Sequence, residues 1–512
     1  MLFFKDTVFF SLRNVLFSLI LLNFAHGQSQ NQYALPIPYT PLASGDVKSP
    51  VLVEALTRAH QMIDKTFNNT DFNTASVAIV QDQSVLLTYG NATSYYSIGS
   101  CTKLFIGLLM MLMRDAGKLS LEDRLTKFIP TFRIRDPYLG RSAEPPTLRM
   151  LASHTAGLPR DHCPLDVPFW KNYSEADVLA YLANTSLLRP PWSSTPSYSN
   201  LGIALLAHAL ETVCGGTWGE CLKTHVWDPL DMGETGAVAT RDQLSNFAPN
   251  PYGEAAKLFD IGYANPSGSM YSTLTDLVKF VKAFNRNDLG LKPYSIDEWA
   301  RPQTLLIGGT NAYGMPFEII KLENESEWVV TKNGRVPGQN SIMMFYRPLK
   351  ISVVALCSGE IDCDTIGLAL LKEVIPAIRK QMANEHAKAK YAGTYAGSTD
   401  RCEWQPGSST CNATLHIYLD SASDSLLADY SVSLANKTVQ NQPAVLIPDE
   451  SNEDTGRFFL VDKTAHLVRK IGSLGAMTNP KGVPVDLLRF EAAEVGMRVL
   501  WGAFGISMTK QT

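Results

Sequence analysis

The sequence has little charge and no excess of basic residues. Charged side chains make up 18% of its 512 residues, and the formal net charge is -4. Proteins that bind nucleic acid usually carry a basic surface, so this balance disfavours nucleic acid as a partner. The hydrophobic share of 45% is instead typical of a globular chain, here long enough for one large domain and a smaller one.

Long apolar runs are also scarce, and beyond the N-terminus none reaches the roughly 20 residues that a membrane-spanning helix needs. At the N-terminus itself, Lys5 and Arg13 precede a short apolar run at 15–22, and Ala25 and Gly27 offer small residues for cleavage. This order is that of a secretory signal peptide. Residues 1–27 are therefore predicted to be a signal peptide, and the mature protein is predicted to be secreted, with no membrane span.

Metal-site spacings are absent, because neither Cys-x-x-Cys nor His-x-x-x-His occurs, and no metal or cofactor is expected. Six of the eight cysteines form three pairs that lie close in the sequence: Cys214 with Cys221, Cys357 with Cys363, and Cys402 with Cys411. In an oxidising compartment these local pairs are the expected disulfides. Spacing does not fix the connectivity, however, and Cys101 and Cys163 are left over.

Asparagine-linked glycosylation motifs agree with a secreted protein. Each Asn-x-Ser/Thr site alone is close to chance, so together they only reinforce the signal peptide. The seven predicted acceptors are Asn68, Asn91, Asn172, Asn184, Asn324, Asn412 and Asn436.

Hydrophobic periodicity predicts a large first domain over 51–383, after a Gln-, Pro- and Ser-rich segment at 28–50 that is expected to be extended. Its expected elements are a helix at 51–66, a hairpin of strands at 76–80 and 84–89, a helical and loop-rich middle with a helix start at 119–123, strands at 328–331, 341–346 and 351–356, and a closing helix at 366–382. One sheet built from both ends of the domain, with a helical lobe between, is an α/β plus all-α arrangement.

The C-terminal part has a different pattern. Residues 384–390 are expected to form a linker. Strand-like runs then recur between turns, and they predict a smaller all-β domain over 391–512, barrel- or sandwich-like. This second domain carries no recognisable chemical motif.

The sharpest candidate for chemistry is a serine and a lysine one helical turn apart. Ser100 follows Gly99 and precedes a run at 104–113 that is apolar on every face, which predicts a helix buried in a large core. Lys103 lies one turn on and on the same face. A hydroxyl beside a buried amine is the pairing expected of a serine nucleophile with its base.

Two neighbouring features are expected to be structural. Cys101 lies about a third of a turn off the Ser100–Lys103 face. His154, within a Ser-His-Thr-Ala-Gly stretch, is expected to organise a loop rather than to complete a catalytic triad. An α/β-hydrolase is disfavoured, because its Gly-x-Ser-x-Gly motif is absent.

Three motifs stand in the order found in the serine β-lactamase and penicillin-binding-protein superfamily. Ser-x-x-Lys at 100–103, Tyr-x-Asn at 198–200 and Lys-Asn-Gly at 332–334 resemble its first, second and third motifs. The Tyr-x-Asn form resembles the branch of class C (AmpC-type) β-lactamases, family VIII carboxylesterases and fungal β-lactamase-like transesterases. The likeness covers residues from about 50 to 380, and the C-terminal region resembles the β appendage of secreted fungal β-lactamase-like hydrolases.

This resemblance implies an acyl-enzyme mechanism. Ser100 would attack an ester or amide carbonyl, and either Lys103 or Tyr198 would take its proton. Burial and the neighbouring Lys332 would lower the pKa of the Lys103 amine, while two ammonium groups would stabilise the Tyr198 phenolate, so the choice of base stays open. The backbone N–H groups of Ser100 and Arg335 would hold the oxyanion.

The resemblance also assigns a set of substrate-binding residues, with two departures from the family pattern. Asn333 stands where penicillin-recognising members usually have Thr or Ser to hold the β-lactam carboxylate, and Arg335 is bulkier than the small residue common there. A small-molecule ester, amide or lactone is therefore favoured over a β-lactam. The predicted substrate-binding residues are Asn200, Lys332, Asn333, Gly334 and Arg335.

The leading hypothesis is thus a secreted, monomeric serine hydrolase. No glutamate motif of the class A type is present, so deacylation would rely on Tyr198 and Lys103. Two alternatives stay open: an acyltransferase or transesterase of secondary metabolism that uses the same residues, and a catalytically silent binding protein that keeps the fold.

Overall fold

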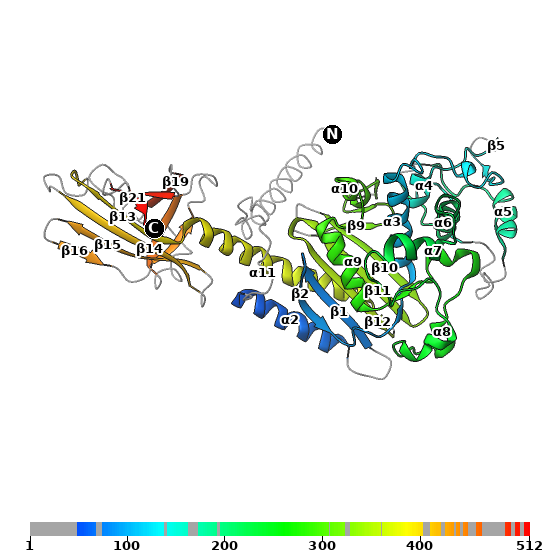
Figure 1. Cartoon of the computed structure of the whole chain (residues 1–512), viewed down its shortest axis with the longest axis horizontal. Helices are drawn as coiled ribbons and strands as arrows, with labels where there is room; N and C mark the ends of the chain where they lie inside the picture. Colours follow the sequence, from blue (N-terminus) through cyan, green and yellow to red (C-terminus); the bar gives the residue numbers. More distant parts are fainter. Residues whose placement is uncertain are drawn as a thin grey trace, which may run out of the picture. The chain divides into compact units, whose positions relative to one another are not determined.

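The computed structural model describes residues 49–67, 74–137, 141–161, 173–191, 195–306, 308–322, 328–359, 361–402, 410–420, 425–434, 437–440, 444–448, 457–462, 487–492, 497–501 and 506–511. The chain forms two compact units, one over Pro41–Arg379 and one that contains Lys380–Thr512 (Figure 1). The predicted signal peptide and residues 28–48 of the predicted extended segment lie outside the described residues.

The larger unit is built on an eight-stranded sheet in the order β2-β1-β12-β11-β10-β9-β8-β7, in which neighbouring strands pair antiparallel. Its strands are β1 (Thr74–Gln81), β2 (Ser84–Tyr89), β7 (Thr304–Leu305), β8 (Asn311–Tyr313), β9 (Glu318–Lys321), β10 (Trp328–Val336), β11 (Gln339–Tyr346) and β12 (Ile351–Ser358). The predicted hairpin and the sheet built from both ends of the domain are confirmed. The short strands β7, β8 and β9 were not predicted.

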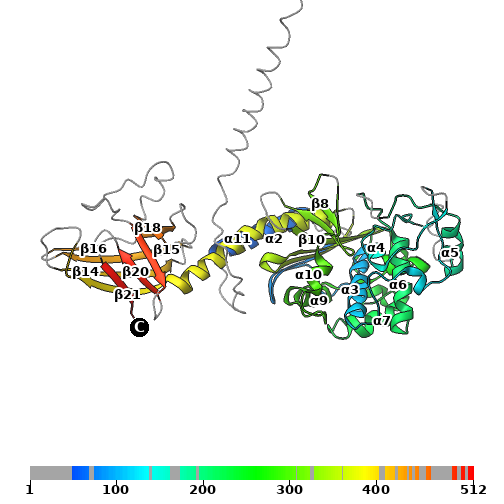
Figure 2. The ribbon, with the colours of Figure 1, turned by 90° about the horizontal axis from the view of Figure 1, so that it is seen from above.

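Side chains alternate between the two faces of this sheet. In β11, Met343 and Phe345 belong to the main core, whereas Ile342 and Met344 face Gly367 of α11 (Cys363–Tyr391). Figure 2 shows α2 (Pro50–Thr66) with α11 on this second face, and α9 (Leu274–Arg286) with α3 (Thr102–Asp115) on the first. The domain is therefore layered, with the sheet between helices, and its fold class is the predicted one.

Helix α3 is the centre of the main core. Its residues from Thr102 to Met111 are all buried, as the apolar run predicted. Helix α6 (Asn200–Cys214) packs beside it. This helix begins after its N-cap Ser199, whose Oγ accepts from Gly202 N at 2.8 Å, and it ends at Gly215, whose φ is 84°.

The remaining helical and short elements of the larger unit are η1 (Gly99–Cys101), η2 (Leu125–Lys127), α4 (Leu148–Ala152), α5 (Glu175–Ala183), α7 (Trp218–Leu222), η4 (Lys223–Trp227), η5 (Arg241–Asn246), α8 (Glu254–Lys257), η6 (Gly262–Ser267), α10 (Ser295–Ala300), η7 (Arg347–Leu349), and the two-stranded ladders β3 (Tyr96–Ser97) with β6 (Tyr271–Ser272) and β4 (Arg135–Asp136) with β5 (Arg141–Ser142). Of these, α4, α5 and α7 lie in the lobe around α6 (Figure 1).

The helix start predicted at 119–123 is wrong. Ser120 N donates to Asp123 Oδ2 at 2.8 Å, which closes a turn instead. The carbonyl oxygens of Leu121 and Asp123 accept from the backbone of Arg149 and Leu148 at the start of α4. Because these carbonyls are bonded to a distant segment, they cannot begin an i to i+4 helical ladder.

The smaller unit is all β, as predicted. Its strands are β13 (Gly393–Thr399), β14 (Cys411–Asp420), β15 (Ser425–Leu434), β16 (Lys437–Gln440), β17 (Ala444–Pro448), β18 (Arg457–Asp462), β19 (Leu487–Ala492), β20 (Met497–Trp501) and β21 (Ile506–Lys510). They form one sheet in the order β14-β13-β21-β20-β19-β18-β17-β15-β16, and β14 also pairs with β15. That extra pairing curls the sheet into a barrel-like domain around Tyr395, Leu415 and Trp501.

The predicted linker at 384–390 is helical, because α11 runs through it to Tyr391. The division between the two units, after Arg379, also falls within this helix. The segment is rich in Ala, Lys and Glu, which are strong helix formers. Its helix propensity accounts for its conformation.

The three expected disulfides are present: Cys214–Cys221, Cys357–Cys363 and Cys402–Cys411. Cys101 is a buried free thiol, and Cys163 lies outside the described residues. Three disulfides are typical of an extracellular protein. In the described part of the chain, no single helix has both the length and the apolar composition to cross a membrane, and the bent pair Asn200–Cys214 with Trp218–Trp227 has them only when taken together.

Candidate active site

Ser100 lies in the single turn η1, directly before α3. This turn approaches β10 backbone to backbone, which requires glycine on both sides. A Cβ on Gly99, whose φ is +51°, would lie 2.7 Å from the nitrogen of Arg335, and a Cβ on Gly334 would lie 1.9 Å from the oxygen of Ile98. The predicted substrate-binding residue Gly334 is therefore buried at this contact, where it lets β10 reach the serine turn.

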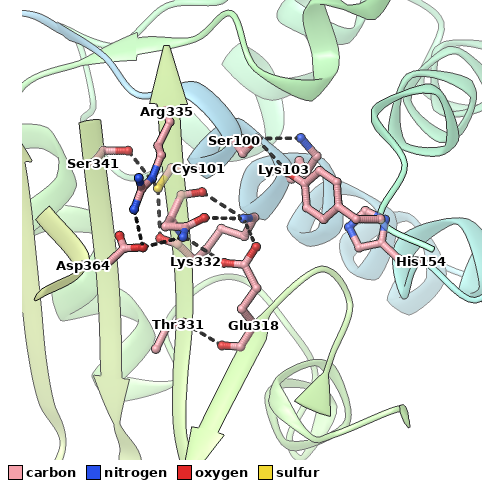
Figure 3. A network of polar contacts seen from close by, with 12 residues as sticks. Ser100, Cys101, Lys103, His154, Glu318, Thr331, Lys332, Arg335, Ser341 and Asp364 are labelled. Carbon is pink, nitrogen blue, oxygen red and sulfur yellow. Dashed lines mark hydrogen bonds and ion pairs between the residues drawn. The ribbon is translucent and has the colours of Figure 1, made fainter. Parts of the chain in front are cut away.

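Hydrogen bonds to β10 and β11 hold the serine turn in place. Ser341 Oγ donates to Ile98 O at 2.7 Å. Cys101 Sγ donates to Lys332 O at 3.1 Å (Figure 3). Burial raises the pKa of the Cys101 thiol to about 12, so this group stays neutral. As expected, Cys101 is a structural residue.

Ser100 Oγ has two polar neighbours that could take its proton. Lys103 Nζ donates to it at 2.9 Å, and Tyr198 OH donates to it at 2.8 Å. Lys103 Nζ also donates to Asn200 Oδ1 at 2.8 Å and to Ser267 O at 2.6 Å. The structure thus brings the first and second motifs together around one hydroxyl, with half-buried Ser100 reachable from solvent.

Both neighbours have a lowered pKa, for different reasons. Burial lowers the pKa of the Lys103 amine, and the positive charge of Lys332 lowers it further, against an opposing pull from Tyr198. Burial alone would raise the pKa of the Tyr198 phenol, but the charges of Lys103 and Lys332 outweigh it, so that this pKa is lowered as well. Deprotonation of either group turns it from a donor to Ser100 into an acceptor of its proton.

The ring of Tyr198 is held from several sides. His154 stacks on it with 4.5 Å between ring centroids, and Lys103 Nζ, Arg160 Cζ and Lys332 Nζ lie 4.9, 4.9 and 5.6 Å from its centroid. These contacts fix the position of the ring beside Ser100.

His154 organises the loop that carries this tyrosine, as expected. Its Nδ1 accepts from Ser199 N at 3.1 Å. Burial, with the nearby cations, keeps the pKa of His154 well below its ordinary 6.5, so the imidazole is neutral and its Nδ1 can accept. A charged His154 would add a further positive charge beside Tyr198.

Lys332 lies in a different environment from Lys103. Its Nζ donates to Glu318 Oε1 at 2.6 Å and to Asn333 O at 2.9 Å (Figure 3). Burial opposes its charge, but the Glu318 carboxylate dominates, so the pKa of Lys332 is raised and the amine stays protonated. Glu318 opens the four-residue strand β9 and belongs to no recognised motif, so no sequence signal marks it as a site residue.

Asn333 of the third motif and Arg335, directly after it, also face carboxylates. Asn333 Nδ2 donates to Asp364 Oδ2 at 2.6 Å. Arg335 Nη2 donates to Asp362 Oδ1 at 2.7 Å and lies 3.4 Å from Asp364 Oδ2. These two aspartates, at the start of α11, were also missed, and no sequence signal connects them to the motif.

The backbone of Arg335 faces the serine turn. Along an antiparallel strand, N–H groups point alternately to one side and the other. The N–H of Asn333 points away from β11, since it donates to Glu318 Oε2 at 3.1 Å. Two residues on, the N–H of Arg335 has the same direction, toward Gly99 of the serine turn. A carbonyl oxygen between the N–H groups of Ser100 and Arg335 would receive two donors.

Asn200 is the remaining predicted substrate-binding residue, and both ends of its amide are engaged. Its Oδ1 accepts from Lys103, and its Nδ2 donates to Asp161 Oδ1 at 2.7 Å. Asp161 also pairs with Arg160, at 3.2 Å. This chain of contacts fixes the orientation of the amide oxygen toward Lys103.

Other predictions concern the surface of the chain. Asn91, Asn184 and Asn412 are at least partly exposed, and their glycosylation stays a prediction. The other predicted acceptors, Asn68, Asn172, Asn324 and Asn436, lie outside the described residues. Within the described part of the chain, no group of three or more His, Cys, Asp or Glu side chains could hold a metal ion.

Comparison with known proteins gives one family match and several relatives. Residues 59–366 match the family model described as Beta-lactamase. Beta-lactamase-like protein 2 of Dictyostelium discoideum is 30% identical over 328 residues, which are 60% of this chain and 59% of that protein. Penicillin-binding protein 4* of Bacillus subtilis is 25% identical over 296 residues, 53% of this chain and 62% of that protein. The chain thus spans less than two thirds of the length of both relatives.

Two solved structures share the fold. The octameric penicillin-binding protein homologue from Pyrococcus abyssi is 18% identical and covers 89% of this chain and 100% of its own, with a TM-score of 0.53. A class C beta lactamase from Rhodobacter sphaeroides is 16% identical and covers 64% of this chain and 99% of its own, with a TM-score of 0.51. These likenesses support a β-lactamase-like fold followed by an all-β domain.

Proposed function

This chain belongs to the beta-lactamase family, and from that premise we propose that it is a serine hydrolase that cleaves an ester or amide bond of a small molecule through an acyl-enzyme. One observation carries the proposal: Oγ of Ser100 lies 2.9 Å from Nζ of Lys103 and 2.8 Å from the hydroxyl of Tyr198. A nucleophile within hydrogen-bond reach of two groups with lowered pKa values is the arrangement that acyl transfer requires.

In the acylation step, Ser100 Oγ bonds to the substrate carbonyl carbon and passes its proton to the deprotonated member of the Lys103–Tyr198 pair. The electron pair of the carbonyl double bond moves to the carbonyl oxygen. When this tetrahedral oxyanion collapses, the bond to the alkoxide or amine breaks, and the leaving group takes up the proton. The product of this half-reaction is an acyl-enzyme on Ser100 and a free alcohol or amine.

The backbone N–H groups of Ser100 and Arg335 are the proposed oxyanion donors. Removal of one such donor typically costs about 100-fold or more in turnover. The close backbone approach at Gly99 and Gly334 supports this role, because it holds the two strands of backbone rigidly against each other.

In the deacylation step, a water molecule replaces the leaving group. The same pair takes a proton from the water as its oxygen bonds to the acyl carbon, and the proton returns to Ser100 Oγ as the acid is released. Asn200 keeps Lys103 oriented through both half-reactions.

We also propose that the protein is secreted. The three disulfides support this, since disulfides persist in oxidising compartments. The signal-peptide pattern at residues 1–27 independently supports secretion.

The experiment that tests the activity uses the full-length mature chain. It is incubated with p-nitrophenyl butyrate to follow ester cleavage, and with a fluorophosphonate to label an activated serine, with tryptic mass spectrometry to locate the adduct. The expected result is ester turnover and an adduct on Ser100, both lost in Ser100→Ala. An unlabelled, inactive protein with native circular dichroism would favour the catalytically silent binding protein.

A further inference from the structure

We propose that Glu318, Asp362 and Asp364 make this site select acyl substrates that carry no negative charge near the scissile bond. The inference rests on the proposed function and deepens it, because it names the charge class of the substrate. Its physical basis is that the polar side chains at 332, 333 and 335 are already held by carboxylates of the protein itself.

Glu318 already occupies the charge of Lys332. The Lys332 side chain is fully buried, and that of Glu318 is 23% exposed. Both oxygens of Glu318 are used, one by Lys332 Nζ at 2.6 Å and the other by Asn333 N at 3.1 Å. A substrate carboxylate that approached Lys332 would have to displace this doubly bound carboxylate or lie beside it and be repelled.

The side chains of Asn333 and Arg335 are also held by carboxylates of the protein. The Asn333 amide N–H₂ donates to Asp364 at 2.6 Å, so it is turned toward α11. The Arg335 guanidinium lies 2.7 Å from Asp362 and 3.4 Å from Asp364. A carboxylate group on the substrate would therefore compete with two aspartates for the donors of these side chains.

The side chains around the third motif carry a net negative charge. In this part of the site, two cations (Lys332 and Arg335) face three carboxylates, which leaves one negative charge. At the other end of the site, Arg160 and Asp161 pair with each other and add no net charge. The pKa of Lys103 is lowered by burial, and the amine adds no positive charge once it is deprotonated. An uncharged acyl group meets none of the resulting repulsion.

The test compares two esters that share a leaving group. In p-nitrophenyl benzoate the acyl ring is unsubstituted, and in mono-p-nitrophenyl isophthalate it carries a meta carboxylate that cannot reach its own ester carbonyl. After division by the rate of hydroxide hydrolysis of each ester, the native protein is expected to show a kcat/KM at least about 10-fold higher for the benzoate, a factor that corresponds to about 1.4 kcal/mol. Glu318→Gln is expected to reduce this preference by about 10-fold, and Asp364→Asn by less.

A matched control and a measurement without variants keep the test sharp. Glu373→Gln removes the charge of another ion-paired glutamate, whose partner is Arg58 on α2, and it should leave the preference unchanged. If Glu318→Gln fails to fold, the salt dependence of the native protein serves instead. Raising the ionic strength from about 0.02 to 0.5 M should narrow the preference, because salt screens the repulsion of a partly exposed site.

The outcomes separate this inference from the proposed function. Equal use of the two esters by the native protein, or a preference that Glu318→Gln leaves intact, would overturn the charge selection while turnover stands. If neither ester is cleaved and no Ser100 adduct forms, the proposed function fails. In that case the charge selection, which rests on the proposed function, is overturned with it.

Discussion

Two lysines lie in the same site with buried side chains, yet the protein treats their charges in opposite ways. The hydrogen-bond acceptors of Lys103 are the neutral oxygens of Ser100, Asn200 and Ser267, and burial lowers its pKa. Lys332 contacts the carboxylate of Glu318, and its pKa is raised. One amine is thus prepared to lose its proton, and the other keeps it.

This contrast explains how the two ends of the site can divide the chemistry. Removing an amine from water disfavours its charged form, unless an opposite charge replaces the lost solvation. At Lys103 no such replacement is among its three bonded partners, so the group can act as a base. At Lys332 the replacement is Glu318, so a permanent positive charge lowers the pKa values of Lys103 and Tyr198 nearby.

The largest expected effect comes from removing the deprotonatable amine. Lys103→Met should reduce the acylation rate by about 1,000-fold, because it removes one candidate base and one of the charges that stabilise the Tyr198 phenolate. Stopped-flow measurement of the p-nitrophenol burst gives this rate. Lys279→Met, on a partly exposed lysine of α9, is the matched control and should have a normal burst. A full burst in Lys103→Met would show that this amine has no part in the reaction.

Substitutions at the two lysine sites should also have different effects on the stability of the protein. Glu318→Gln should lower the free energy of unfolding by roughly 2 kcal/mol, because it leaves the buried Lys332 charge without its partner. Lys103→Met should leave the stability about equal or raise it, since it removes an amine whose burial is unfavourable. Urea unfolding followed by tryptophan fluorescence measures both variants. A larger loss in Lys103→Met than in Glu318→Gln would reverse the assignment of the two environments.

The pH profile should shift in opposite directions in two variants. The base must be deprotonated, and its pKa lies below the ordinary 10.5 of lysine or 10.0 of tyrosine. The acylation rate should therefore increase as the pH rises through this lowered pKa and reach a plateau above it. Lys332→Gln removes a positive charge, raises the pKa of the base and should move the rise up by about one pH unit.

Glu318→Gln provides the opposite arm of that experiment. The negative charge of Glu318 raises the pKa values of both Lys103 and Tyr198, so its removal should move the rise to lower pH. Neither variant changes the two other neighbours of Tyr198, the Arg160 guanidinium and the neutral His154 imidazole. Profiles of kcat/KM that move in the same direction in the two variants would contradict the electrostatic account.

The smallest effect is expected at Arg335. Its guanidinium is 57% exposed and already paired with Asp362, whereas its backbone N–H is the proposed oxyanion donor and remains in alanine. Arg335→Ala should therefore reduce kcat/KM for p-nitrophenyl butyrate by less than about 10-fold. A loss as large as that of Lys103→Met would mean that the side chain itself contacts the reacting group.

Much of the fold could be predicted because its long elements have strong patterns. The ten apolar residues that follow Lys103 could only be a buried helix, and the strands at both ends of the larger unit are long enough to show a strand pattern. Strands β7, β8 and β9 have two to four residues, too few for a periodic signal. The sequence pattern of the linker predicted at 384–390 did not indicate that it continues α11.

The site was predictable only where a motif carried it. Ser100, Tyr198 and Lys332 stand in recognisable motifs, so their convergence could be inferred across a long stretch of sequence. Glu318 reaches the site through strand register, in which Thr331 pairs with Glu318, and no local pattern reveals such a pairing. The carboxylates that distinguish the two ends of the site are therefore visible only in three dimensions.

The most direct test of the account is a titration of the two ammonium groups by NMR, with ¹⁵N-labelled lysine side chains. The signal that disappears in Lys103→Met is expected to lose its proton below the ordinary pKa of 10.5, while the signal that disappears in Lys332→Met stays protonated above it. Equal midpoints for the two signals, or a Lys103 that remains charged to the higher pH, would contradict the division of the site into a base and a permanent charge.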